Sequence, residues 1–186
     1  MTSRFFDLAI ASFSLALVLL AATWPVHAED KLARGKYLVT TSGCNDCHTP
    51  WKMGEPAPDM SRMLSGHPEK MALPPAPKPV GPWIVSAAAT NTAWSGPWGV
   101  SYTANLTPDR ETGLGKWTQR NFTETLRTGR HMGRGRVILP PMPIPMYKHF
   151  TDADLEAMFA YLQSIPAIRN KVPDPQPPAG DIASAR

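Results

Sequence analysis

The chain has 186 residues, a length that fits one ordinary domain and is too short for two large ones. Charged residues make up 18% and hydrophobic residues 42%, which excludes both a highly charged disordered polymer and a multi-span membrane protein. The 21 prolines are about twice the average usage, so helices are confined to the proline-free windows. The net charge is +4 at pH 7, which makes the surface mildly basic.

Residues 1–28 are typical of an export signal. Arg4 gives a positively charged start, residues 8–22 form an apolar run, and Val26-His27-Ala28 offers small residues for cleavage. The apolar run is shorter than the roughly 20 residues of a membrane-spanning helix, which favours cleavage over an uncleaved membrane anchor. For an exported basic chain, acidic proteins or a membrane surface are better partners than nucleic acid.

One helix is predicted in the first part of the remaining chain and another in its middle. The first covers roughly residues 30–42, where Gly35 lowers helix stability unless another helix packs closely against it. The second begins at Thr118, runs to about Thr128 and ends at the helix breaker Gly129.

A third helix is predicted after Thr151, which with Asp154 forms a capping box. Pro166 stops this helix. Its apolar residues recur at the spacing of a single helical stripe: Leu155, Met158, Phe159 and Leu162.

Long proline-rich segments separate these helices. Residues 50–108 hold eleven of the prolines and show no sustained period of 2 or 3.6, which predicts a long loop region, with polyproline II at residues 74–79. Residues 173–186 are also rich in proline and are expected to form a flexible tail. The prediction is an all-α domain at residues 29–172, with about three main helices and long loops.

The motif that carries chemistry is Cys44-Asn45-Asp46-Cys47-His48, the C-x-x-C-H pattern of covalent c-type haem attachment. Two intervening residues bring both sulfurs to one edge of the porphyrin, where each adds to a vinyl group. The histidine that follows can turn its imidazole beneath the iron. We therefore predict one haem c, bound covalently through Cys44 and Cys47, with His48 as an axial iron ligand.

Other roles for the cysteine pair are less well supported. A thioredoxin-like C-x-x-C needs a βαβ context, which the proline-rich sequence after His48 does not offer. A structural zinc site needs four ligands, whereas the chain has only two cysteines. A metal or thiol redox protein would retain titratable cysteines, which distinguishes it from a haem protein.

The sixth iron ligand is predicted to be Met142, which prolines flank on both sides. A thioether there raises the reduction potential and favours electron transfer over gas binding. His67, His131 and His149 are weaker candidates. The alternative is an open iron position, which would make the protein a haem enzyme or a gas-binding sensor.

Two further clusters each allow more than one interpretation. A basic cluster follows the second helix and could neutralise haem propionates, dock an acidic partner or simply be solvated; it comprises Arg127, Arg130, His131, Arg134 and Arg136. A methionine-rich loop could bind copper(I) with His67, or its methionines could fill the core; it comprises Met53, Met60, Met63 and Met71.

Because of the haem motif and the proline-flanked methionine, the sequence resembles class I c-type cytochromes. More narrowly, it resembles the cytochrome c domains in the cytochrome subunits of bacterial alcohol, aldehyde and gluconate dehydrogenases. The matching stretches are Arg34-Gly35-Lys36-Tyr37-Leu38, Asn105-Leu106-Thr107-Pro108-Asp109, Thr112-Gly113-Leu114-Gly115-Lys116-Trp117, Pro141-Met142-Pro143 and Thr151-Asp152-Ala153-Asp154-Leu155. Those subunits usually carry several haem motifs, whereas this chain has one.

The resemblance implies a cytochrome c fold in which the first and last helices cross near Gly35 and Tyr161. It also places the ligand methionine between prolines, nine residues before the threonine that caps the last helix, which selects Met142 over Met146. The implied function is one-electron transfer in the periplasm, as part of a respiratory chain and without catalysis of its own. The implied partners are a dehydrogenase or quinol-oxidising donor and a cytochrome or oxidase acceptor.

Overall fold

The structure is a computed structural model that describes residues 30–77 and 81–178, so the predicted export signal lies outside the described residues. The chain divides into a unit at residues 1–30 and a second unit at residues 31–186, and only the second is considered below. Its elements, in chain order, are α2 (Lys31–Thr41), α3 (Cys44–His48), the 3-10 turn η1 (Met60–Arg62), β1 (Ser86–Ala87), β2 (Ala93–Gly96), β3 (Gly99–Tyr102), α4 (Gln119–Thr128), the 3-10 turn η2 (His131–Gly133), α5 (Ile144–Tyr147) and α6 (Asp152–Ser164).

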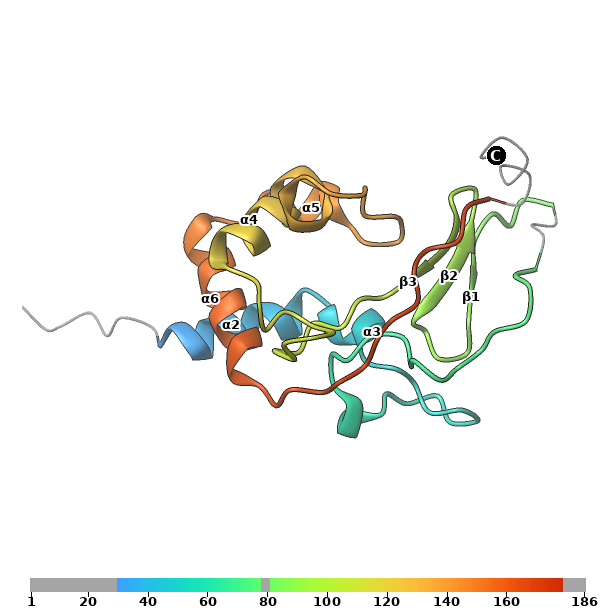
Figure 1. The fold of residues 1–186 in the computed structure, drawn as a ribbon, viewed down its shortest axis with the longest axis horizontal. Helices are drawn as coiled ribbons and strands as arrows, with labels where there is room; N and C mark the ends of the chain where they lie inside the picture. Colours follow the sequence, from blue (N-terminus) through green and yellow to red (C-terminus); the bar gives the residue numbers. More distant parts are fainter. Residues whose placement is uncertain (1–29, 78–80, 179–186) are drawn as a thin grey trace, which may run out of the picture. The chain divides into compact units, whose positions relative to one another are not determined.

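Helices α2 and α6 pack directly against each other, as the resemblance implies (Figure 1). A Cβ atom built on Gly35 would lie 2.0 Å from the carbonyl oxygen of Ala157 and 2.8 Å from Cβ of Tyr161. Glycine at this position therefore lets the two backbones approach, which explains an otherwise unfavourable residue within a helix. The predicted crossing near Gly35 and Tyr161 is confirmed.

The ends of the predicted helices are also confirmed. The side chain of Thr118 accepts a hydrogen bond from the backbone N–H of Asn121 at the start of α4, and the Asn121 side chain accepts one from the backbone of Thr118. Gly129 ends α4 in the left-handed conformation, with φ of 67°. The Thr151 hydroxyl accepts the N–H of Asp154 at the start of α6.

The main core lies where α2, α4 and α6 meet the haem-motif turn. Phe122 of α4 and Phe159 of α6 pack with their ring centroids 5.5 Å apart. Buried apolar side chains from all three helices belong to the same core: Leu38, Val39, Leu126, Leu155, Met158 and Leu162. Their burial is the main source of stability for the helical part of the domain.

The expectation of a purely all-α domain needs a correction. Strands β1, β2 and β3 form a three-stranded antiparallel sheet in that order, within the segment predicted to be loop. The strands are only two to four residues long; β2 reads Ala-Trp-Ser-Gly and β3 reads Gly-Val-Ser-Tyr. Such short segments cannot show an alternation of apolar and polar residues that could be recognised in the sequence. A tight hairpin joins β2 and β3, whose pairing runs up to Gly96 and Gly99 (Figure 1).

The C-terminal segment makes backbone contacts with the sheet at Gln176. The backbone of Gln176 exchanges two hydrogen bonds of 2.9 Å with Val100 of β3. Just before it, the buried amide of Asn170 donates to the carbonyl oxygens of Ser65 and His67. These contacts tie the C-terminal segment to the proline-rich half of the domain, a pairing that local sequence does not encode.

Helix α5 is a single helical turn that the sequence analysis did not predict. Pro145 lies in its first turn, where a missing N–H is tolerated.

Within the described residues, no helix has the length and apolar character needed to cross a membrane.

Candidate haem site

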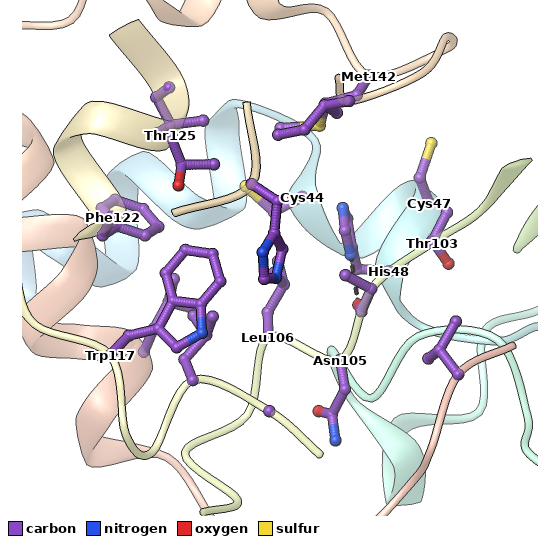
Figure 2. A pocket seen from close by; sticks show the side chains of 18 of the residues that line it. Cys44, Cys47, His48, Thr103, Asn105, Leu106, Trp117, Phe122, Thr125 and Met142 are labelled. Carbon is purple, nitrogen blue, oxygen red and sulfur yellow. Dashed lines mark hydrogen bonds between the residues drawn. The ribbon is translucent and has the colours of Figure 1, made fainter. Parts of the chain in front are cut away.

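A cavity of about 380 Å³ lies beside α3, and its walls come from segments far apart in the sequence. All four residues predicted to bind haem line this one cavity: Cys44, Cys47, His48 and Met142 (Figure 2). The remaining walls are mainly apolar and include Leu106, Leu114, Trp117, Phe122, Leu126 and Met158. Its size and apolar lining are those of a cofactor site.

The haem motif folds as a single helical turn, α3. Gly43, with φ of 71°, turns the chain in the left-handed conformation just before it. Residues three apart in a helix lie on the same side, so the turn presents Cys44 and Cys47 to the same cavity. Figure 2 shows His48 between the two cysteines, with Met142 above them in that view.

His48 is held in one orientation. Its side chain is buried, with the residue 8% exposed, and Nδ1 lies 2.8 Å from the carbonyl oxygen of Ala104. A carbonyl can only accept, so Nδ1 carries the proton and Nε2 keeps its lone pair. Burial lowers the pKa of His48, although the bond to Ala104 opposes this, and the imidazole is therefore neutral and able to bind a metal.

The sheet and a glycine turn place Ala104 against His48. Strand β3 continues into Thr103 and Ala104, and the backbone N–H of Gly66 donates to the carbonyl of His48 at 2.8 Å. A Cβ atom on Gly66 would lie 2.4 Å from the carbonyl oxygen of Thr103, so only glycine fits between the two segments. Sequence reasoning missed both Ala104 and Gly66, because their role depends on a contact between distant segments.

The two thiols have raised pKa values. Burial raises the pKa of Cys44 to about 12, and burial also raises the pKa of Cys47. Reactive redox cysteines instead have lowered pKa values, because their chemistry uses the thiolate. The electrostatic surroundings of this pair therefore do not match a thioredoxin-like thiol centre.

Met142 and Met146 have different surroundings. Met142 is partly buried and lines the cavity, whereas Met146 on α5 is 71% exposed. The O–H of Tyr147, also on α5, donates to the carbonyl oxygen of Ser42, next to the turn that starts α3. This bond fixes the methionine-bearing segment to the haem-motif segment, and burial raises the pKa of Tyr147 to about 12, so it stays a donor.

The three histidines considered as weaker iron ligands have different surroundings in the structure. His131 lines the cavity and contacts Trp117 edge-on, with ring centroids 5.1 Å apart. His67 is fully buried elsewhere, with its ring nitrogens 3.0 Å from the Thr92 hydroxyl and 3.3 Å from the carbonyl of Met71. His149 is exposed and does not line the cavity. Because both ring nitrogens of His67 are hydrogen-bonded, His67 is also unsuited to the copper(I) site considered for the methionine-rich loop.

The basic cluster after α4 is partly neutralised. Arg127 pairs with Asp152 at 2.6 Å and also donates to the carbonyl of Lys148. Arg130 donates to the carbonyl of Gly135 at 3.1 Å. Arg134 and Arg136 are exposed, and Arg136 lines the cavity, so Arg136 places positive charge there.

The donor set and the cavity fit a covalently bound haem. Two thiols stand three residues apart on one helical turn, next to a neutral imidazole with a free lone pair, and a thioether faces the same apolar space. A haem of the c type needs this combination of two sulfurs and a histidine.

No family model matches the chain. It is 30% identical over 155 residues to the cytochrome c subunit of the quinone-dependent alcohol dehydrogenase of Gluconobacter oxydans, an alignment that covers 80% of this chain and 26% of that protein. It is 28% identical over 152 residues to the gluconate 2-dehydrogenase cytochrome c subunit of Pantoea cypripedii, covering 79% and 27%. The chain is thus related to cytochrome c.

A third similarity is to the fructose dehydrogenase cytochrome subunit of Gluconobacter japonicus, with 27% identity over 133 residues, 72% of this chain and 21% of that protein. The chain spans about a quarter of the length of these relatives. The relationship thus concerns one part of each relative.

Proposed function

We propose that this protein is a periplasmic mono-haem c-type cytochrome that carries single electrons. The observation that carries the proposal is the meeting of Cys44, Cys47, His48 and Met142 at one apolar cavity, with His48 oriented by Ala104. Haem c supplies a one-electron iron centre when bound. The relatives named above, which are cytochrome subunits of dehydrogenases, support the same function.

In this proposal each group in the cavity has one task. Cys44 and Cys47 would hold the haem through thioether bonds, and His48 would provide a nitrogen ligand to its iron. Met142 would provide a sulfur ligand, which would favour the ferrous state and raise the reduction potential. The apolar walls, among them Leu106, Phe122 and Met158, exclude water from the haem.

The proposed partners are redox proteins, with a dehydrogenase or quinol-oxidising complex as donor and a cytochrome or oxidase as acceptor. The relatives are subunits of dehydrogenases, which supports a dehydrogenase as donor. The protein would then transfer electrons without making or breaking a substrate bond. Its mildly basic composition suits an acidic partner or the surface of a membrane.

The test is a pyridine haemochrome assay on protein exported in a bacterium with c-type haem maturation. One covalently bound haem per chain is expected, retained on a denaturing gel. Replacing Cys44 or Cys47 by serine should weaken attachment, and replacing His48 should abolish a normal holoprotein. Absence of haem, or haem extracted by acid acetone, would refute the proposal. Rapid carbon monoxide binding by the reduced wild-type protein would instead favour a gas-binding haem protein.

A further inference from the structure

His131 is an exposed residue that lines the same cavity, and it has no role in the electron carrier described above. Its ring stands edge-on to that of Trp117, with centroids 5.1 Å apart and an interplanar angle of 88°. In Figure 2, Trp117 lies across the pocket from His48. His131 and its contact Trp117 both line the cavity that His48 also lines.

A short structured turn holds His131 there. The backbone N–H of His131 donates to the carbonyl of Arg136 at 2.9 Å, and its carbonyl accepts from Gly135 at 2.8 Å. Between them Met132 has φ of 52°, in the left-handed region that non-glycine residues rarely occupy. Backbone strain of this kind costs about 1–3 kcal/mol and is concentrated at functional sites.

The side chain of His131 is not used to hold this turn together. Across the described residues, the hydrogen bonds of His131 involve only its backbone, while its ring contacts Trp117. By contrast, both ring nitrogens of the buried His67 are engaged, and Nδ1 of His48 is engaged with Ala104. His131 is thus the cavity histidine whose nitrogens are both available to a ligand.

We propose that His131 competes with Met142 for the coordination position opposite His48, so that this cavity can offer either a thioether or an imidazole to the haem iron. The inference rests on the proposed function. Both residues lie on the same connection between α4 and α6, eleven residues apart, and both line the cavity. The exchange changes only which protein atom donates an electron pair: Sδ of Met142 leaves as an imidazole nitrogen of His131 binds, and no proton moves if that nitrogen carries none.

The two ligands differ in chemistry. A thioether ligand raises the reduction potential relative to other axial ligands, so imidazole in its place should lower it. The competition would give one chain two reduction potentials, depending on which side chain is bound to the iron. It also implies that loss of Met142 does not leave the position open.

The experiment compares holoproteins carrying Met142→Ala, Met142→Ala with His131→Leu, and Met142→Ala with His149→Leu as the matched control. Covalent haem is measured first by pyridine haemochrome, then the spin state by absorption and electron paramagnetic resonance, and finally carbon monoxide binding by the reduced proteins. We expect Met142→Ala and the His149 control to be low-spin with nitrogen ligation on both faces. The His131 double variant should be high-spin. If His131 occupies the position about 90% of the time, its removal raises apparent carbon monoxide affinity about tenfold.

A Met142→Ala protein that is high-spin and binds carbon monoxide as well as the His131 double variant does would overturn the inference, while leaving the cytochrome proposal intact. Absence of covalent haem in the wild-type protein would instead overturn the cytochrome proposal itself. If the Met142 variants do not yield holoprotein, Met142 can be oxidised with peroxide in folded wild-type and His131→Leu holoproteins. The first should then remain low-spin and the second become high-spin; equal behaviour would contradict the inference.

Discussion

Nδ1 of His48 lies 2.8 Å from the carbonyl oxygen of Ala104, a residue 56 positions further along the chain. This bond fixes both the tautomer and the ring orientation of the histidine, leaving Nε2 for the cavity. Its partner is placed by strand β3 and by the close passage of Gly66. The small sheet, which looks peripheral to the helical part of the domain, therefore helps to orient His48, the proposed nitrogen ligand.

Gly66→Ala tests this link between the sheet and the histidine. The new Cβ would meet the carbonyl oxygen of Thr103 at 2.4 Å, and the position has φ of 77°. We expect the free energy of unfolding, measured with urea, to fall by more than the roughly 1–2 kcal/mol that the left-handed conformation alone costs. We also expect a changed haem spectrum. Gly54→Ala is the matched control, because it has φ of 83° and no atom within 4 Å of the added carbon. Equal losses at the two positions would show that the contact with Thr103 is unimportant.

Met142→Ala should remove the weak far-red sulfur-to-iron band of the oxidised holoprotein and lower its reduction potential, because the thioether ligand is lost. Met146→Ala should change neither, since Met146 is 71% exposed and does not line the cavity. Absorption spectra and a redox titration check both. A band that survives in Met142→Ala and disappears in Met146→Ala would reverse the assignment of the sulfur ligand.

Gly35→Ala should destabilise the protein even though it improves helix propensity. In an exposed helix the change would stabilise by about 1 kcal/mol. Here the added carbon would lie 2.0 Å from the carbonyl oxygen of Ala157, so α2 and α6 must separate. We expect a net loss of about 1–3 kcal/mol, as for other overpacked sites. Lys36→Ala, an exposed neighbour on α2, should change stability by less than about 0.5 kcal/mol; a stabilised Gly35→Ala protein would contradict the tight crossing.

The Asp154 carboxylate should make stability depend on acid pH. Hydrogen bonds from Arg34, at 2.9 and 3.1 Å, and then from Thr151 lower the pKa of Asp154 below its ordinary 3.8. A lowered pKa in the folded state means that the stabilisation is complete above 3.8 and is lost as the pH falls through the folded-state value. The free energy of unfolding, measured with urea, should therefore decrease less between about pH 5 and about pH 2 in Asp154→Asn than in the wild-type protein. An unchanged pH profile would exclude a role for this pair in acid stability.

The exposed basic residues that follow α4 predict a salt effect on electron transfer. Arg134 and Arg136 are exposed and have no ion pair among the described side chains, unlike Arg127, which Asp152 neutralises. Transfer to an acidic redox protein should slow as salt rises, because the screening length falls to about 10 Å at 0.1 M and about 3 Å at 1 M. Arg134→Glu should reduce both the rate and its salt dependence, whereas Lys52→Glu, the same charge change in the loop after the haem motif, should not. Rates that do not depend on salt would indicate a solvated surface without a docking role.

The features fixed by the sequence are those that neighbouring residues determine. Thr118, Gly129 and Thr151 set the ends of two helices because capping and left-handed turns involve residues three or four apart. The haem motif is equally local, since one helical turn suffices to aim Cys44 and Cys47 at the same space.

Only the tertiary structure decided how distant segments meet at the site. The strands are too short to show an alternating pattern, so the sheet, the Ala104 carbonyl and the place of Gly66 had no local signal. The three histidines look alike in sequence, yet packing buries His67 among its own partners. His131 and His149 are both exposed, and of the two only His131 lines the cavity. These outcomes depend on contacts between residues tens of positions apart, and the free energy of such contacts comes from burial and hydrogen bonding across segments, which no local pattern records.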